Sequence, residues 1–275
     1  MRTTWYMLEK EILEHKIVTR LPLFMVACAV LFISGVVWNI EYRLTINSVN
    51  FAEITDSIVV NGYAGSIGAI NFAVSSLVSL MLSTIYLGKT LRKEKEEGSI
   101  MFWRSMPITD TQSVLVKLLF ALIVIPLICS LLLMSADVMI WIVSLVFSDA
   151  ISNFSSSVTL SEMVIHWIEF VSRMCIASIA LFPFASLILV ASQKTKYPLI
   201  AIFFGGYIVS LLGTYLFGTS MISDILQQNL SLPMSIIFSD TLIEGLQFGE
   251  STYSMISLVA GALLLAIAIK LRSDN

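Results

Sequence analysis

Charge is scarce in this sequence, and that scarcity excludes most classes of soluble protein. Asp, Glu, Lys and Arg make up 13% of the 275 residues, whereas hydrophobic residues make up 57%. Soluble domains carry about twice that share of charged residues. The net charge of −3 says little by itself, because the distribution of charge matters more than its total. The composition therefore predicts an integral membrane protein without a nucleic-acid partner.

Cysteine and histidine are sparse as well. The three cysteines, Cys28, Cys129 and Cys175, lie inside apolar runs and match no metal-ligand spacing, so we interpret them as small core residues. His166 has carboxylates nearby but no second histidine near it, which falls short of a zinc site. No HExxH motif is present. We expect no metal site, no redox chemistry and no catalytic residues.

The chain also lacks a nucleotide-binding loop. Gly88-Lys89-Thr90 looks like the end of a Walker A motif, but that motif requires another glycine five residues earlier, where this chain has Ser83. Without that glycine the backbone cannot cradle phosphates. We predict that this chain binds no cofactor and that any ATP is hydrolysed on another chain.

Six apolar runs are long enough to cross a bilayer, which takes roughly 20 helical residues. They are residues 22–40, 69–87, 118–147, 161–191, 197–217 and 251–269. Residues 1–20 mix apolar and charged positions, and Trp5 and Tyr6 suit the headgroup layer. We predict an interfacial elbow helix there, or alternatively a cytoplasmic extension of the first span. The predicted fold is an all-α integral membrane protein with one transmembrane domain, residues 1–275.

The positive charges orient the predicted spans. Fourteen of the sixteen Lys and Arg residues fall on one side of this topology, and only Arg43 and Arg173 do not. Segments rich in Lys and Arg stay in the cytoplasm. Both termini are therefore predicted to be cytoplasmic, and the opposite, outer side has short acidic connections.

The last outer connection, residues 218–250, has an unusual pattern. Pro233 divides it into two apolar segments, residues 219–232 and 234–248, and each is too short to cross a bilayer. We predict two short helices, broken at Pro233, that form a re-entrant or interfacial hairpin. The alternative is a surface loop that rests on the headgroups.

The longest polar interval runs from Lys89 to Lys117 and holds six of the sixteen Lys and Arg residues. A charged helical segment within it, residues 91–97, is predicted to stop at Gly98. The sequence SIMFWRSM follows and predicts a short aromatic helix, residues 99–107 with the closing Pro107, across the membrane surface.

A new helix is predicted directly after this aromatic segment. Thr109 and Gln112 have the spacing of a capping box, Thr-x-x-Gln. Asp110 adds negative charge at the positive end of the helix dipole. These signals place the start of the third spanning region.

Three landmarks of this interval resemble those of ABC-2 type permeases, the membrane subunits of ABC exporters. They are Glu97-Gly98-Ser99, Met106-Pro107 and Lys117. Ser99 stands where the family usually has Thr, and Val116 stands where it has the Gly before Lys117. In that family this loop is a coupling helix that docks into a groove of a separate ATP-hydrolysing subunit.

The resemblance implies a role for the whole segment in coupling to an ATPase subunit. The implied contact residues are Glu96, Glu97, Gly98, Ser99, Phe102, Trp103, Arg104, Met106 and Pro107. From the residues alone, the aromatic pair suits either a groove in a partner or the aromatic belt of a membrane interface.

The resemblance also implies partners and a location. Two ATPase subunits that bind ATP and Mg²⁺, a second copy of this chain and membrane lipids are the expected partners, in the inner membrane of a prokaryote. The implied function is outward transport of a lipid-like, drug-like or peptide molecule. The alternative is a secondary transporter or channel that is not coupled to ATP.

Three ionisable residues are expected at membrane depth: Asp137, Glu169 and Arg173. Asp137 and Arg173 each lie ~30 Å from the cytoplasmic charges along their helices, so they should be level and able to pair. Glu169 and Arg173 have i,i+4 spacing, which also favours an ion pair. These residues predict either an outer gate that contacts cargo or a structural clamp.

Overall fold

The computed structural model describes residues 2–38, 63, 66–96, 98, 109–146, 158–217, 221–239 and 252–274. Every regular element in these ranges is a helix, which confirms the predicted all-α class. The elements are α1 (Arg2–Glu14), α2 (Lys16–Trp38), α4 (Ser66–Glu96), α6 (Asp110–Leu119), the π-helix η1 (Phe120–Val124), α7 (Ile125–Val146), α8 (Leu160–Lys194), α9 (Pro198–Phe217), α10 (Met221–Phe238) and α12 (Thr252–Asp274).

Within the described ranges, five helices are long and apolar enough to cross a membrane. They cover Ile67–Glu96, Asp110–Leu145, Leu160–Lys194, Pro198–Tyr215 and Met255–Ser273. These helices coincide with five of the six predicted spans and make the chain a multi-pass membrane protein. The described α2 contains the first predicted span as far as Trp38, and the total of six stays a prediction.

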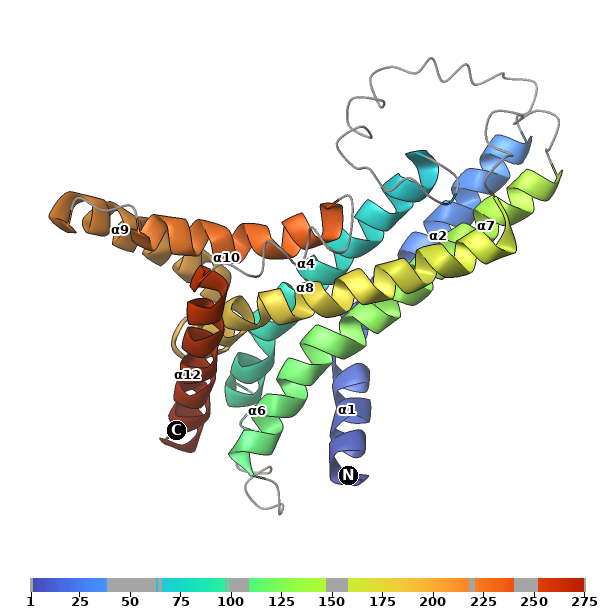
Figure 1. Ribbon diagram of the computed structural model, residues 1–275. Coiled ribbons are helices and arrows are strands. Elements are labelled where there is room, and N and C mark those ends of the chain that lie inside the picture. Colours follow the sequence, from blue (N-terminus) through green and yellow to red (C-terminus); the bar gives the residue numbers. More distant parts are fainter. Residues whose placement is uncertain are drawn as a thin grey trace.

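Helix α8 is the element against which most others pack. It contacts α4, α7, α9, α10 and α12, and it runs beside α7 in the opposite direction (Figure 1). Its fully buried Phe170 and Ile188 belong to one continuous apolar core with Phe72 of α4 and Ile125 of α7. Both termini lie at the same end of the bundle, next to the start of α6 (Figure 1).

The N-terminal region consists of two helices. α1 ends at Glu14 and α2 begins at Lys16, so residues 16–20 belong to the helix of the first predicted span and not to the predicted elbow helix. α1 packs against α6 as well as α2. It is therefore a separate packed helix and not a simple extension of α2, and its interfacial position stays a prediction.

Pro126 lies two residues after η1, the one π-helical segment of the described chain. A proline has no N–H to offer the carbonyls four and five residues before it, which here are those of Leu122 and Ala121. Ser83 of α4 donates to the Ala121 oxygen and Ser178 of α8 donates to the Leu122 oxygen, both at 2.7 Å. Hydroxyl groups of two neighbouring helices thus satisfy these carbonyls, as apolar surroundings demand.

Helix α10 contradicts the predicted break at Pro233. It continues through this residue from Met221 to Phe238. Proline removes one hydrogen bond, but its fixed φ remains compatible with a helix, and packing offsets the loss because Ile236 and Ile237 are buried and α10 contacts α8. The first residues of the predicted second segment thus belong to α10, and the rest of that segment, residues 240–248, lies outside the described residues.

Candidate functional site

The described chain includes only part of the predicted coupling segment. Outside it lie Glu97, Ser99, Phe102, Trp103, Arg104, Met106 and Pro107. Glu96 is exposed, and its Oε1 lies 2.7 Å from Nε of Arg92. Gly98 has a φ of +66°, which glycine adopts without strain, and its N–H donates to the Lys95 carbonyl at 3.4 Å. The charged helical segment therefore stops at Gly98 as predicted.

A buried ion network lies where the two helices that flank this segment meet. Lys117 of α6 is its centre: Nζ is 2.5 Å from Oε1 of Glu11 on α1 and 2.9 Å from Oε1 of Glu94 on α4. Lys117 also donates to Oγ1 of Thr90 at 3.0 Å. One ammonium group thus joins three helices.

Arg272 brings the C-terminal helix into the same network. Its Nη1 lies 3.0 Å from Oε2 of Glu94, and its Nε donates to Oδ1 of Asp110 at 3.2 Å. We call the buried residues Glu11, Glu94, Lys117 and Arg272, together with the partly exposed Asp110 at their edge, the buried ion network. It connects α1, α4, α6 and α12.

Because these charged side chains are buried, each one needs its partners in the network to be stable. The side chains of Lys117, Glu11, Arg272 and Glu94 are 2%, 5%, 5% and 7% exposed. A buried charge is tolerated when it is paired and hydrogen-bonded, and the loss of one partner is strongly destabilising. The network therefore holds its four helix ends in one arrangement.

Glu11 is held in its charged form. Burial is the largest influence on its pKa and acts to raise it, but the charge of Lys117 and hydrogen bonds from Lys117 and Tyr86 together outweigh burial, so the pKa lies below its ordinary value. The Tyr86 hydroxyl donates to Oε2 of Glu11 at 2.7 Å. For His15, burial lowers the pKa more than the Glu11 carboxylate raises it, which favours neutral imidazole.

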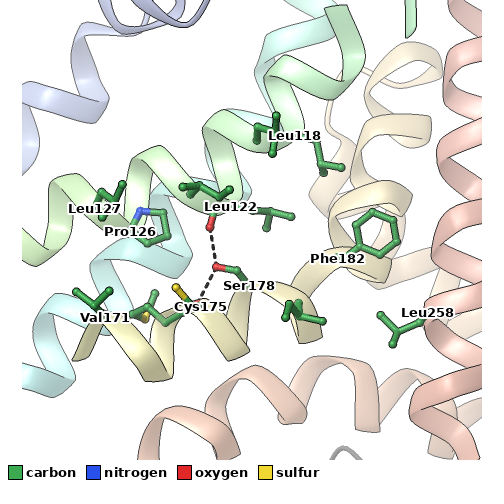
Figure 2. A pocket seen from close by; sticks show the side chains of 13 residues that line it. Leu118, Leu122, Pro126, Leu127, Val171, Cys175, Ser178, Phe182 and Leu258 are labelled. Carbon is green, nitrogen blue, oxygen red and sulfur yellow. Dashed lines mark hydrogen bonds between the residues drawn. The ribbon is translucent and has the colours of Figure 1, made fainter. Parts of the chain in front are cut away.

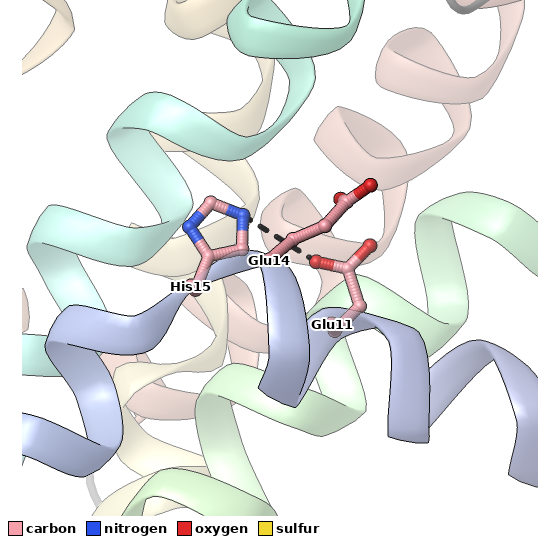
Figure 3. A group of neighbouring side chains, drawn as sticks. All are labelled: Glu11, Glu14 and His15. Carbon is pink, nitrogen blue, oxygen red and sulfur yellow. Dashed lines mark ion pairs between the residues drawn. The ribbon is translucent and has the colours of Figure 1, made fainter.

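Glu11, Glu14 and His15 place possible metal ligands within 4.8 Å of one another. Figure 3 shows the His15 ring facing Glu11 from the next helical turn, with 3.5 Å between Nε2 and Oε2. Both Glu11 oxygens already have partners, and Oε1 of Glu14 is 3.1 Å from Nζ of Lys10. The ammonium of Lys117 would also repel a cation. This cluster fits an ion-pair role better than a metal site.

At the other end of the α7–α8 pair, Asp137 is fully buried. The prediction that it pairs with Arg173 is wrong, because other residues are its partners. Its Oδ1 accepts a hydrogen bond from Nδ2 of Asn71 at 2.7 Å, and its Oδ2 lies 2.8 Å from Nδ1 of His166. The Tyr63 hydroxyl donates to the Asp137 carbonyl at 2.6 Å. The helical register turns Asp137 toward α4 and the His166 face of α8, which estimates of depth alone could not show.

Arg173 acts as a clamp between α8 and α10. Nη2 lies 2.7 Å from Oε1 of Glu169, so the predicted i,i+4 pair is present. Nη1 donates to the carbonyls of Ile237, at 3.2 Å, and Ser239, at 2.5 Å. A cation at the C-terminal end of a helix also complements its dipole. These contacts favour the structural role over direct contact with cargo.

Sequence reasoning missed most of the buried ion network. Lys117 and Glu94 lie in the polar interval, but no local pattern links them to Glu11 or Arg272 near the two ends of the chain. Glu11 and Lys117 are 106 residues apart in sequence. A usable signal was the position of Lys117 within an apolar run, because a lysine there needs a buried partner.

An apolar groove of about 430 Å³ lies between the α6–α7 segment, α8 and α12. Its lining includes Leu118, Leu122, Pro126, Cys175, Phe182 and Leu258. Its one hydroxyl, on Ser178, is directed at the Leu122 carbonyl (Figure 2). The groove has no polar group free to orient a polar ligand, so hydrocarbon is the chemistry it accommodates.

Comparisons of the chain with known protein families, curated proteins and solved structures gave no match. Function is therefore inferred from the residues and their geometry.

Proposed function

We propose that this chain is the membrane subunit of an ATP-driven exporter of the ABC-2 type. In this proposal two copies form a path through the cytoplasmic membrane of a prokaryote, with both termini in the cytoplasm. Two separate ATPase subunits bind ATP and Mg²⁺ and dock on the coupling helix, residues 99–107. The cargo is a lipid-like, drug-like or peptide molecule that moves outward. The chain itself contributes no catalytic residue.

The observation that carries the proposal is the position of the buried ion network. Glu94 precedes the coupling segment and Asp110 follows it, and Arg272 bonds both carboxylates. Lys117 then joins Glu94 to Glu11 on α1. A push on residues 99–107 therefore acts on both flanking helices at once, and the ion pairs pass it on to α1 and α12. A rigid group of helix ends suits a switch between two transport states.

A secondary transporter not coupled to ATP is the second candidate, and one observation favours it. Asp137 and His166 form a buried pair between two membrane helices, and ionisable groups in such places are typical of proton and ion pathways. Transport driven by a pH gradient without ATP would identify this function.

Co-purification from membranes in a mild detergent tests the exporter proposal. We expect an ATPase to co-purify with the wild-type chain and to be lost from the Phe102→Ala/Trp103→Ala variant. The matched control is Trp5→Ala/Tyr6→Ala, which removes another aromatic pair, exposed on α1, and should retain the ATPase. Failure to recover any ATPase, or equal loss from both variants, would contradict the proposal.

A further inference from the structure

A basic groove lies between the last turns of α4 and the connection from α8 to α9, and we propose that it binds the phosphate of an anionic phospholipid. The groove has a volume of about 570 Å³. Among the described residues, four cations line it, Lys89, Arg92, Lys93 and Lys196, together with one carboxylate, Glu96. The proposal does not depend on the exporter function.

Two of these cations, Lys89 and Lys196, have no carboxylate partner among the described residues. Arg92 pairs with Glu96 at 2.7 Å, and Nζ of Lys196 lies 5.7 Å from the centre of the Tyr197 ring. The exposed Lys89 has no hydrogen bond or ion pair with any residue of the described ranges. An anion between Lys89 and Lys196 would supply the missing negative charge.

The first turn of α9 adds to this preference for an anion. α9 begins at Pro198, and Leu199 and Ile200 also line the groove. The first N–H groups of a helix have no partner within it and carry partial positive charge. Gly88 allows this approach, because a Cβ there would lie only 3.3 Å from Cγ of Pro198. The glycine therefore brings the α9 start next to Lys89.

The apolar surroundings select a lipid over a soluble anion. Ile85 and Leu199 also line the groove. From its edge, an exposed apolar stripe follows α9 at i,i+4 spacing, and each member is more than half exposed: Ile200, Phe204, Ile208 and Leu212. One lipid would match both parts of this surface, with its phosphate at the cations and its acyl chains along the apolar stripe.

The level of the groove agrees with this ligand. Lys89 lies two residues beyond the predicted span 69–87, at the side where the positive charges predict the cytoplasm. The cytoplasmic leaflet contains anionic lipids, and basic pockets between membrane helices on that side bind their headgroups. The groove therefore meets a bilayer at the depth of the phosphates.

The test measures binding of phosphatidylglycerol and phosphatidylcholine with identical acyl chains to the purified full chain, by native mass spectrometry and by the thermal unfolding midpoint. We expect preferential binding of phosphatidylglycerol and protection by it. Lys89→Gln/Lys196→Gln should weaken this binding by about 30-fold, since each basic residue near a membrane surface contributes about fivefold. Lys10→Gln/Lys270→Gln, with the same change of charge elsewhere, should bind like the wild type.

Three outcomes would overturn the proposal. The first is equal binding of the two lipids, and the second is equal weakening in both double variants. The third is a rise in the unfolding midpoint with inorganic phosphate or with a poly-glutamate peptide that is as large as the rise with phosphatidylglycerol. Such a result would assign the groove to a soluble anion or to an acidic protein. Equal unfolding midpoints of all variants in phosphatidylcholine establish that they fold. No ATPase takes part, so the result is separate from that of the co-purification.

Discussion

Replacement of Lys117 by methionine tests the buried ion network most directly. The side chain is 2% exposed and contacts two carboxylates, Glu11 and Glu94. After Lys117→Met, Glu94 keeps Arg272 as its partner, but Glu11 keeps only uncharged Tyr86 and the weakly basic His15. Removal of one partner of a buried ion pair costs about 3–5 kcal/mol. We expect Lys117→Met to destabilise the chain by about that amount.

A second variant separates lost charge compensation from lost packing. In Lys117→Met/Glu11→Gln both members of the pair are neutral, so no carboxylate is left uncompensated and the cost should fall below about 2 kcal/mol. The measurement is thermal unfolding in detergent, where 1 kcal/mol corresponds to roughly 2–4 °C for a chain of this size. Lys270→Met, which removes a less buried cation from α12, should be nearly neutral. A Lys117→Met variant that unfolds like the wild type, or a double variant no more stable than the single one, would show that the ion pairs do not hold these helices together.

Three further predictions concern pH, the π-helix and helix contact. The lowered pKa of Glu11 adds stability that is fully present above its ordinary value near 4.5 and is lost as the pH falls through the folded-state pKa; unfolding midpoints between about pH 7 and 3 should show this loss, and Glu11→Gln should flatten it. Ser83→Ala should lower the free energy of unfolding by about 1–3 kcal/mol, because it leaves the buried Ala121 carbonyl without a donor. In a chain that already carries Pro126→Ala, the same substitution should cost less, and a double-mutant cycle of unfolding free energies measures the difference. Gly261→Ala should lower the unfolding midpoint, since its Cβ would lie 2.8 Å from the α8 backbone, whereas Gly205→Ala has open space and should be neutral or stabilising.

The helices were predictable from the sequence because a bilayer imposes a minimum length on an apolar helix. Local signals also set some ends correctly: Thr109 caps α6 by accepting a hydrogen bond from the Gln112 N–H at 3.3 Å, and Gly98 ends the charged segment of α4. Pro233 misled the prediction, because tertiary packing of α10 decides whether a proline ends a helix. Local chemistry thus predicts ends well where a cap or a positive φ is required and poorly where packing competes.

The candidate site was predictable only in outline. The i,i+4 pair of Glu169 and Arg173 follows from the spacing within one helix, and it is present. The partners of Asp137 and Lys117 lie on other helices, and they depend on how each helix is rotated about its axis. A single sequence provides no measure of that rotation, so these contacts required the three-dimensional arrangement.

The serine hydroxyls beside Pro126 limit how this bundle can rearrange. If the α6–α7 segment slid by one turn along α4, the Ala121 carbonyl would face hydrocarbon without a donor, and a slide along α8 would do the same to the Leu122 carbonyl, at a cost of several kcal/mol each. Around η1, the three helices should consequently travel as one block. A large displacement between conformations then has to come from helices at the periphery of the bundle that make fewer contacts, such as the largely exposed α9.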